Sequence, residues 1–164
     1  MTTRSDREHS INHLVGAVFR LNGRLVEVGN RLTEDTGLTD ARWQVLGAIS
    51  SSPVPLPVAH IARNMGLSRQ AVQRIVDLLA HRGLVQFVPN PHHQRAKLVV
   101  LTAEGWVAEN TADERWQPWA RDLEAALGRE QIVAARDLLS RMDALLANAF
   151  PSAGEEADPQ AVDR

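Results

Sequence analysis

No cysteine occurs among the 164 residues of this chain. That absence excludes a disulfide, a thiolate nucleophile, a thiol redox switch and a cysteine-ligated zinc site. The chain also has no apolar run approaching the roughly 20 residues that span a bilayer. Its polar start, MTTRSDREHS, is not followed by the apolar segment of a secretory leader. We therefore expect a cytoplasmic protein that has no membrane partner.

The sequence contains few of the patterns that indicate catalysis. It has no G-x-S-x-G elbow, no glycine-rich phosphate loop and no H-E-x-x-H motif. The histidines at positions 9, 13, 60, 81, 92 and 93 do not have the spacing of metal ligands. We expect no enzymatic activity, no cofactor and no metal site.

Charge is segregated along the chain, although the net charge is only −2. Between Leu56 and Lys97 there are six basic residues and one acidic residue, Asp77. The remainder carries 12 basic and 19 acidic residues, a net charge of −7. A basic segment between acidic flanks is what local binding to phosphates requires. The length and the apolar content of 44% fit one globular domain.

The stretch Val58–Arg82 has the pattern of two helices joined by a tight turn. Ala62 allows a close crossing, Gly66 allows a positive φ in the turn, and Ser68 can cap the second helix. The apolar stripe of that helix comprises Val72, Ile75, Val76 and Leu79. Its opposite face carries residues that bond phosphates and base edges: Arg69, Gln70, Gln73 and Arg74. The pattern predicts a helix-turn-helix, with an ordinary corner between two helices as the alternative.

A β-hairpin is predicted directly after the helix pair. Its strands are residues 84–88 and 97–101, and its loop, residues 89–96, is polar and rich in turn formers. Residues Pro55 and Leu56 can add a very short third strand, because two strands alone are marginal.

Long amphipathic helices flank this centre. Apolar residues recur at three- and four-residue steps from Ile11 to Leu32, which predicts a helix that follows a loose arm and ends at Gly37. Thr39 is the expected N-cap of the next helix. Helices are also expected from Thr102, with a bend at Pro118, and again beyond Gly128. The acidic tail, residues 151–164, is expected to be disordered.

This order of elements resembles the MarR family of bacterial transcription regulators. The match is closest over residues 56–105, which end in Leu-Thr-Ala-Glu-Gly. The resemblance implies a mainly α fold with a β-hairpin wing: a winged helix-turn-helix at residues 39–101, with dimerisation helices at 10–36 and 102–150. It also implies a homodimer on double-stranded DNA, with a recognition helix of each subunit in successive major grooves.

The expected DNA contacts follow from the resemblance and from residue type. The recognition helix would present Ser68, Arg69, Gln70, Gln73 and Arg74. Arg95 corresponds to the family's wing arginine, which enters the minor groove. Lys97, Arg63 and Arg42 are further candidates for the phosphate backbone. Many members carry an acidic residue ahead of the wing arginine, where this chain has His92 and His93, and histidine protonation near neutrality can make wing affinity depend on pH.

An effector site is the least determined part of the prediction. Members of the family often bind small aromatic or phenolic anions, and the candidate residues here are His13, Arg20, Trp43 and Trp106. Core or dimer packing is the alternative role for the tryptophans and is favoured, because large aromatics are mainly buried. The prediction is a sequence-specific regulator, a repressor relieved by a ligand, that binds a pseudo-palindromic operator as a homodimer. The alternative is a winged-helix module that binds proteins and not DNA.

Overall fold

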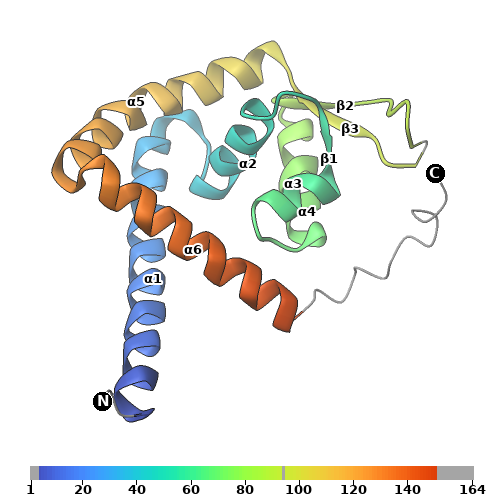
Figure 1. Ribbon diagram of the computed structural model, residues 1–164. Coiled ribbons are helices and arrows are strands. Elements are labelled where there is room, and N and C mark those ends of the chain that lie inside the picture. Colours follow the sequence, from blue (N-terminus) through green and yellow to red (C-terminus); the bar gives the residue numbers. More distant parts are fainter. Residues whose placement is uncertain (1–3, 94, 151–164) are drawn as a thin grey trace. The chain divides into compact units, whose positions relative to one another are not determined.

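The computed structural model describes residues 4–93 and 95–150, with side chains from Ser10 onward. Its elements, labelled in Figure 1, are α1 (Arg4–Leu32), the 3-10 helix η1 (Glu34–Thr36), α2 (Asp40–Ser50), β1 (Leu56–Pro57), α3 (Val58–Asn64), α4 (Arg69–His81), β2 (Val85–Val88), β3 (Leu98–Leu101), α5 (Ala103–Leu127) and α6 (Arg129–Ala149). The predicted class, mainly α with a small β-hairpin, is confirmed. The chain forms two compact units that divide between Gln117 and Pro118.

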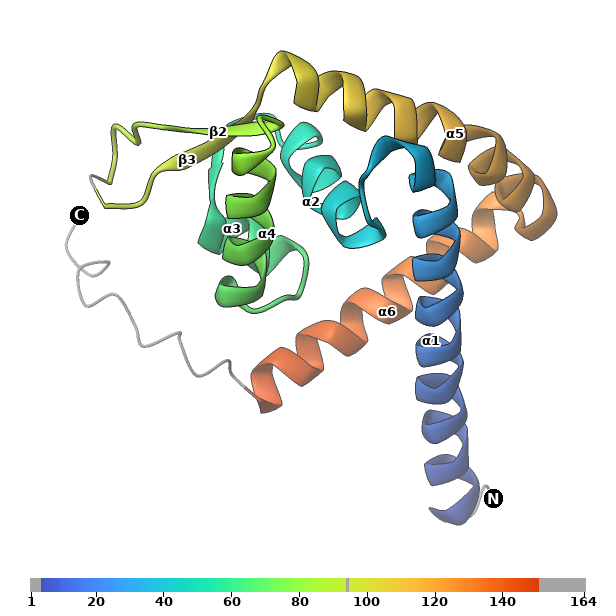
Figure 2. The ribbon, with the colours of Figure 1, turned by 180° about the vertical axis from the view of Figure 1, so that it is seen from behind.

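The core of the first unit lies among α2, α3, α4 and the sheet. Fully buried side chains come from all four: Leu46 of α2, Ile61 of α3, Val72 of α4 and Val99 of β3 are each 0% exposed. The removal of these apolar side chains from water provides most of the free energy that holds the helix pair against the sheet. Figures 1 and 2 show α3 and α4 beside the sheet, with α2 against them.

The turn between α3 and α4 forms as its residues predict. Gly66 has a φ of 64°, the left-handed conformation that glycine adopts without a steric penalty. The amide of Leu67 donates to the Ala62 carbonyl at 3.0 Å, which closes the end of α3. Ser68 then accepts from the amide of Ala71 at 3.2 Å and caps α4. Ala62 is buried at the crossing, so the helix-turn-helix prediction is confirmed in detail.

Three antiparallel strands form the sheet, in the order β1-β3-β2. The register pairs Phe87 of β2 and Leu56 of β1 with opposite sides of Val99 on β3. Strand β1 is only two residues long and includes Pro57, which lacks an N–H and is tolerated at a sheet edge. The predicted third strand is therefore present, one residue later than the expected Pro55-Leu56 pair.

The junction between β3 and α5 is closely bonded. The Thr102 hydroxyl donates to the Gly83 carbonyl at 2.6 Å and accepts from the Gly105 amide at 3.0 Å, while the Thr102 amide donates to Leu84. A β-carbon at Gly105 would lie 2.9 Å from the carbonyl carbon of Leu84 and closer still to its oxygen. These contacts explain why the Leu-Thr-x-Glu-Gly pattern has threonine and glycine at these two places.

Two boundaries near α1 differ from the prediction. The helix begins at Arg4 rather than after a loose arm, because polar residues with adequate helix propensity extend it beyond its amphipathic part. It ends at Leu32, before Gly37, and the chain continues into η1; there the buried Thr33 hydroxyl shares its hydrogen between the carbonyls of Gly29 and Leu38, at 2.9 and 3.2 Å. In both Figure 1 and Figure 2 the N-terminal half of α1 extends away from α2, α3 and α4.

The cap of α2 is also different. Thr39 occupies the N-cap position, but its side chain makes no capping hydrogen bond. The side chain of Asn30 performs this function from α1, since its Oδ1 accepts from the Asp40 amide at 2.9 Å. The predicted helix is present, whereas the predicted capping interaction is wrong.

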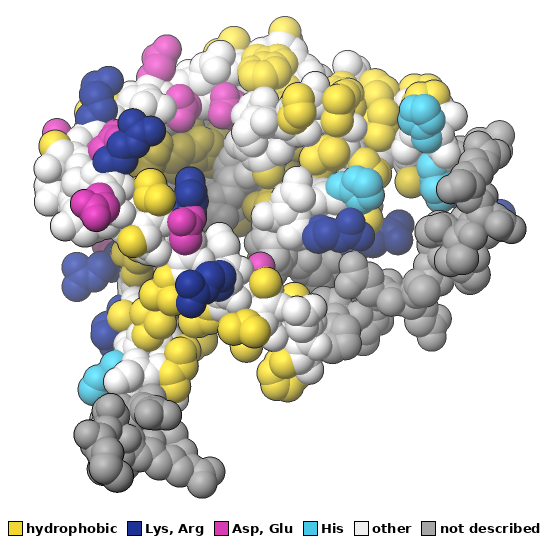
Figure 3. Space-filling model, viewed as in Figure 1, with side chains coloured by type: hydrophobic (Ala, Val, Ile, Leu, Met, Phe, Trp, Pro, Cys, Tyr) yellow, Lys and Arg dark blue, Asp and Glu magenta, His cyan; other side chains and the backbone are white. Residues whose placement is uncertain are grey.

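The second unit contains the end of α5 and all of α6. Gly128, with a φ of 77°, separates the two helices as expected. None of the side chains of α6 is buried within this chain. Large apolar side chains are exposed along the unit: Trp119, Leu123, Leu127, Ile132, Val133, Leu138, Leu139, Leu145, Leu146 and Phe150. Figure 3 shows yellow side chains along α6.

Two expectations from the sequence, the disordered tail and the bend at Pro118, are not tested by the structure. The acidic tail, residues 151–164, lies outside the described residues. Helix α5 is continuous through Pro118, which has no N–H to donate to the preceding turn, and the bend expected there stays a prediction. No helix in the described part of the chain is both long and apolar enough to cross a membrane.

Candidate nucleic-acid interface

Helix α4 presents a polar surface at its N-terminal end. Ser68, Arg69, Gln70 and Arg74 are exposed there, and Gln73 is half-buried. The stripe of Val72, Val76 and Leu79 is fully buried on the opposite side. Burial of that stripe fixes the rotation of α4, so the position of its polar residues follows directly from the core.

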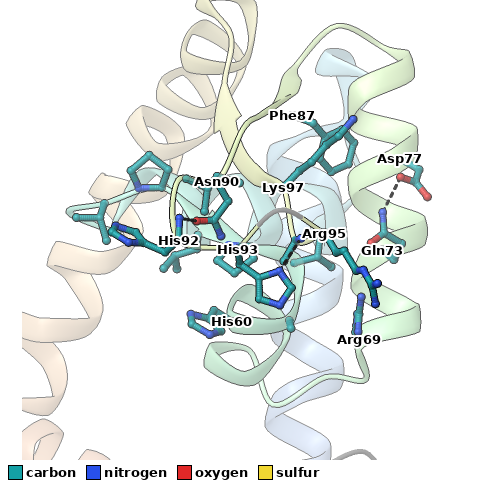
Figure 4. Close-up of a pocket in the computed structure, with 18 residues that line it drawn as sticks. His60, Arg69, Gln73, Asp77, Phe87, Asn90, His92, His93, Arg95 and Lys97 are labelled. Atoms are coloured by element: carbon teal, nitrogen blue, oxygen red, sulfur yellow. Dashed lines mark hydrogen bonds between the residues drawn. The ribbon is translucent and has the colours of Figure 1, made fainter. Parts of the chain in front are cut away.

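A groove of about 1030 Å³ lies between α4 and the wing. Its walls come from three parts of the first unit: the start of α3 with the preceding segment, one side of α4, and the wing. Figure 4 shows Arg69 and Gln73 on the α4 side and Arg95 and Lys97 on the wing, and Phe87 of β2 also lines the groove. The groove thus brings together residues far apart in sequence, including four of the predicted DNA contacts.

The charge of the groove is predominantly positive. Arg69, Arg95 and Lys97 contribute cations, and Asp77 is the sole acidic residue among the described residues that line it. Three histidines, His60, His92 and His93, stand along the same walls. Figure 3 shows histidine and basic side chains gathered beside the wing. Such a surface attracts phosphate groups.

Local hydrogen bonds shape the wing loop. Asn90 Oδ1 accepts from the amide of His92 at 3.0 Å, and the Nδ1 atom of His93 accepts from the amide of Ala96 at 3.1 Å. A ring nitrogen that accepts a hydrogen bond carries no proton, so this arrangement requires that Nδ1 of His93 be unprotonated. His93 therefore holds the loop beside Arg95, a structural role that the sequence did not indicate.

Arg42 and Arg63, which were also predicted to contact the phosphate backbone of DNA, do not line the groove. Arg42 donates to the Gly37 carbonyl at 3.2 Å, and Arg82 donates to the same oxygen. Two cations thus lie at the C-terminal end of η1, where the carbonyls carry partial negative charge. Arg63 is exposed in the last turn of α3.

The four predicted effector residues do not share a described cavity. Trp43 is half-buried and packs edge-on against Trp116, with ring centroids 6.2 Å apart. Trp106 is 45% exposed, and His13 and Arg20 are exposed on α1. A second hollow of about 430 Å³, beside Thr36 and the first turns of α5, is lined by none of the four. The packing of Trp43 with Trp116 agrees with the alternative role considered for the tryptophans.

Two carboxylates near the ends of α1 and α2 have opposite pKa shifts. A hydrogen bond from Arg115, which also bonds the Leu32 carbonyl at 2.7 Å, holds the pKa of Asp35 below its ordinary value of 3.8. Burial raises the pKa of Asp40 above 3.8, although the Gln44 side chain donates to it at 2.7 Å. Arg115 of α5 thus favours the ionised form of Asp35, whereas burial disfavours the ionised form of Asp40.

Sequence reasoning missed the structural roles of three residues. Asp77, counted only as a charge, lines the groove and bonds Gln73. Asn90 and His93 order the wing loop. The signal for the first was the spacing of four between Gln73 and Asp77, which places them on one helix face.

These features define the class of the protein: a winged helix-turn-helix with a basic groove beside its recognition helix. The family model described as MarR family matches residues 36–96. The chain is 36% identical over 132 residues to the uncharacterized protein Rv2011c of Mycobacterium tuberculosis, covering 80% of this chain and 91% of that protein. The chain belongs to the MarR family of transcription regulators, which are non-enzymatic DNA-binding proteins. The resemblance seen in the sequence is confirmed.

Two further relatives are regulators. BadR, a transcriptional activatory protein of Rhodopseudomonas palustris, is 32% identical over 96 residues, which are 57% of this chain and 55% of BadR. The repressor CouR bound to a 23-mer DNA duplex superposes with a TM-score of 0.67 at 25% identity, covering 81% of this chain and 94% of that one. CouR from Rhodococcus jostii RHA1 bound to p-coumaroyl-CoA superposes with a TM-score of 0.62 at 24% identity, covering 83% and 91%.

Proposed function

We propose that this protein is a sequence-specific DNA-binding transcription regulator that binds a pseudo-palindromic operator as a homodimer. The observation that carries the proposal is the groove in which Arg69 of α4 and Arg95 and Lys97 of the wing stand together. Cations arranged around a groove beside an exposed recognition helix fit a phosphate backbone that passes between helix and wing.

The exposed residues of α4 would read base edges. The major groove of B-DNA is about 12 Å wide and admits an α-helix. Arg69 and Arg74 can bond phosphate or the O6 and N7 atoms of guanine, and Gln70 can bond adenine. Arg95 on the wing would enter the adjacent minor groove. Arg63 and Arg42, which do not line the groove, are further candidates for phosphate contacts.

A second copy of the chain would cover the exposed apolar side chains of both units. In the first unit Ile11, Phe19, Leu21 and Leu25 of α1 are 43–71% exposed. In the second, none of the α6 side chains is buried. Exposed apolar surface on such a scale is typical of an interface between subunits. Two recognition helices related by a twofold axis would then reach half-sites about 34–36 Å apart.

The regulator would be a repressor that a small aromatic or phenolic effector releases. CouR, a repressor whose structures contain DNA or p-coumaroyl-CoA, supports this part of the proposal by analogy. An effector of this kind acts by binding more tightly to a dimer whose recognition helices no longer match the operator. His13, Arg20, Trp43 and Trp106 remain the residues to test for effector contacts.

Footprinting on the DNA upstream of the protein's own gene tests the central claim. The expected result is a protected pseudo-palindrome, with affinity that falls steeply as salt rises through release of counterions. The Arg74→Ala variant should bind the site more weakly and remain dimeric by sedimentation. If the wild type protects no sequence at low salt, the protein-interaction alternative replaces the proposal.

A further inference from the structure

The acidic residue of the basic groove is paired with a predicted base-reading residue. Gln73 and Asp77 lie one turn apart on α4, and Gln73 Nε2 donates to Asp77 Oδ1 at 2.7 Å. Both side chains line the groove, and Figure 4 shows the bond between them. A negative charge there opposes phosphate binding, so its presence requires another explanation.

The two groups of the Gln73 amide are not equivalent beside a carboxylate. An ionised carboxylate only accepts hydrogen bonds, so the amide nitrogen must face Asp77. The opposite orientation would place Oε1 against a carboxylate oxygen, and two acceptors repel each other. Asp77 therefore selects one of the two orientations of the amide and leaves Oε1 turned away from it, with one N–H still available.

We propose that Asp77 is a positioning residue that sets the base preference of Gln73. The inference rests on the proposed function, because it requires α4 to enter the major groove. With its oxygen presented, Gln73 favours a base that offers an exocyclic amino group there, which is adenine through N6 or cytosine through N4. Guanine offers only the acceptors N7 and O6 at that edge. The remaining N–H of Gln73 can donate to one of these acceptors, but Oε1 would then lie beside the other, and two acceptors repel each other. To offer guanine both of its N–H groups, Gln73 must turn over and break its bond to Asp77.

An Asp77→Asn variant tests whether Asp77 acts by orienting the Gln73 amide, because it keeps a side chain of similar size at position 77. Asparagine is nearly the same size, yet its amide can accept from Gln73 Nε2 or donate to Gln73 Oε1, so both orientations become available. The variant also removes a negative charge from the groove, which raises affinity for all sequences alike. Relative preference among bases is therefore the informative measurement, because a uniform gain leaves it unchanged.

The experiment is selection from a pool of random duplexes, followed by sequencing, with the full-length wild type and variants. The wild type should enrich adenine or cytosine at one position of each half-site. In Asp77→Asn the acceptance of guanine at that position should rise by about tenfold, the scale of one base contact. Gln73→Ala should lose preference at the same position. The Gln73→Ala/Asp77→Asn double variant should match Gln73→Ala there, because Asp77 acts through Gln73.

The chain supplies a matched control. Gln117 donates to both carboxylate oxygens of Asp113 on α5, at 3.1 and 3.3 Å, outside the groove. Asp113→Asn removes the same charge and disturbs the same kind of pair, and it should leave the selected motif unchanged. Melting temperatures of all variants establish that each one is folded.

Each other outcome overturns the inference. An Asp77→Asn motif identical to that of the wild type contradicts a positioning role, and so does a change spread over many positions. A wild-type preference for guanine or thymine at the position governed by Gln73 contradicts the proposed orientation. If the wild type enriches no motif at all, the proposed function fails and the inference with it, which is distinguishable from a retained motif that Asp77 does not influence.

Discussion

The side chain of Asp40, at the start of α2, fills the space beside Gly29 on α1. A β-carbon at position 29 would lie 2.7 Å from Asp40 Cγ and closer still to Oδ1. The two helices are thus held at a separation that only glycine permits, and Asp40 is buried beside it, with 5% of the residue exposed. One contact accounts both for the glycine and for the raised pKa of Asp40.

Replacement of Gly29 by alanine should destabilise the protein by about 1–3 kcal/mol, the usual cost of overpacking. Gly23→Ala on the same helix is the control, because a β-carbon there meets nothing within 4 Å. That change should be neutral or stabilising, since alanine favours a helix over glycine by about 1 kcal/mol. Urea unfolding of both variants measures the difference, and equal stabilities would disprove the overlap.

The Asp40→Asn variant should change how stability depends on pH. Because the folded-state pKa of Asp40 lies above 3.8, the folded protein holds this proton more tightly than the unfolded chain. Wild-type stability is therefore lost, relative to Asp40→Asn, as pH rises from 3.8 through the folded-state pKa. Unfolding free energies of the two proteins between pH 3 and pH 7 give this difference directly. A difference that is constant with pH would contradict the burial of the charge.

Asp35→Asn should have the opposite pH dependence. Arg115 lowers the pKa of Asp35, so the carboxylate contributes stability that is present above 3.8 and disappears as pH falls through the folded-state value. The stability advantage of the wild type over Asp35→Asn should be seen at neutral pH and vanish in acid. Because Asp35 is largely exposed, added salt should reduce this advantage. The same measurement of unfolding free energy against pH serves both variants. If the stability difference from the wild type changed with pH in the same direction for both, the opposite pKa shifts of Asp35 and Asp40 would be refuted.

Arg95→Ala should weaken operator binding and make it less sensitive to salt. Each phosphate contact contributes about 0.9 to the slope of log affinity against log salt, so a homodimer that loses two should show a slope smaller by about 2. The control is Arg31→Ala, which removes a cation outside the groove whose partner is Glu27 on α1. Fluorescence anisotropy at several salt concentrations measures both slopes. An unchanged slope for Arg95→Ala would remove the wing from the interface.

Leu139→Ala should weaken self-association. The side chain is 41% exposed on α6 within one chain, and its burial by a second copy would stabilise the dimer by up to about 2 kcal/mol in each subunit. Ser140→Ala, at the exposed neighbouring position, is the control and should leave association unchanged. Sedimentation equilibrium measures the dissociation constants. A wild type that remains monomeric at high concentration would contradict the homodimer.

Features determined by neighbouring residues were predictable from the sequence. Gly66 and Ser68 identify the turn and the cap because a positive φ and a short oxygen-bearing side chain are local requirements. The apolar run after Lys97 likewise locates β3 to within one residue. In these places the chemistry of a few consecutive residues decides the structure.

Features that depend on side-chain rotamers or on residues distant in the sequence were not predictable. The cap of α2 comes from Asn30, ten positions before Asp40, because α1 passes close enough to supply a better-placed oxygen than that of Thr39. The spacing of Gln73 and Asp77 places them on one helix face, but their hydrogen bond also depends on side-chain rotamers, which the spacing does not determine. The hydrogen bond from Arg42 to the Gly37 carbonyl was likewise not predictable, and the expected contact of Arg42 with DNA stays a prediction.

The junction at Thr102 and Gly105 also has a mechanical consequence. The hydrogen bonds of Thr102 and the close approach of Gly105 to Leu84 connect the base of the wing tightly to the first turn of α5. We therefore expect a displacement of that turn to move the hairpin with it. The wing and the start of α5 would then move together as one rigid body about the junction at Gly105.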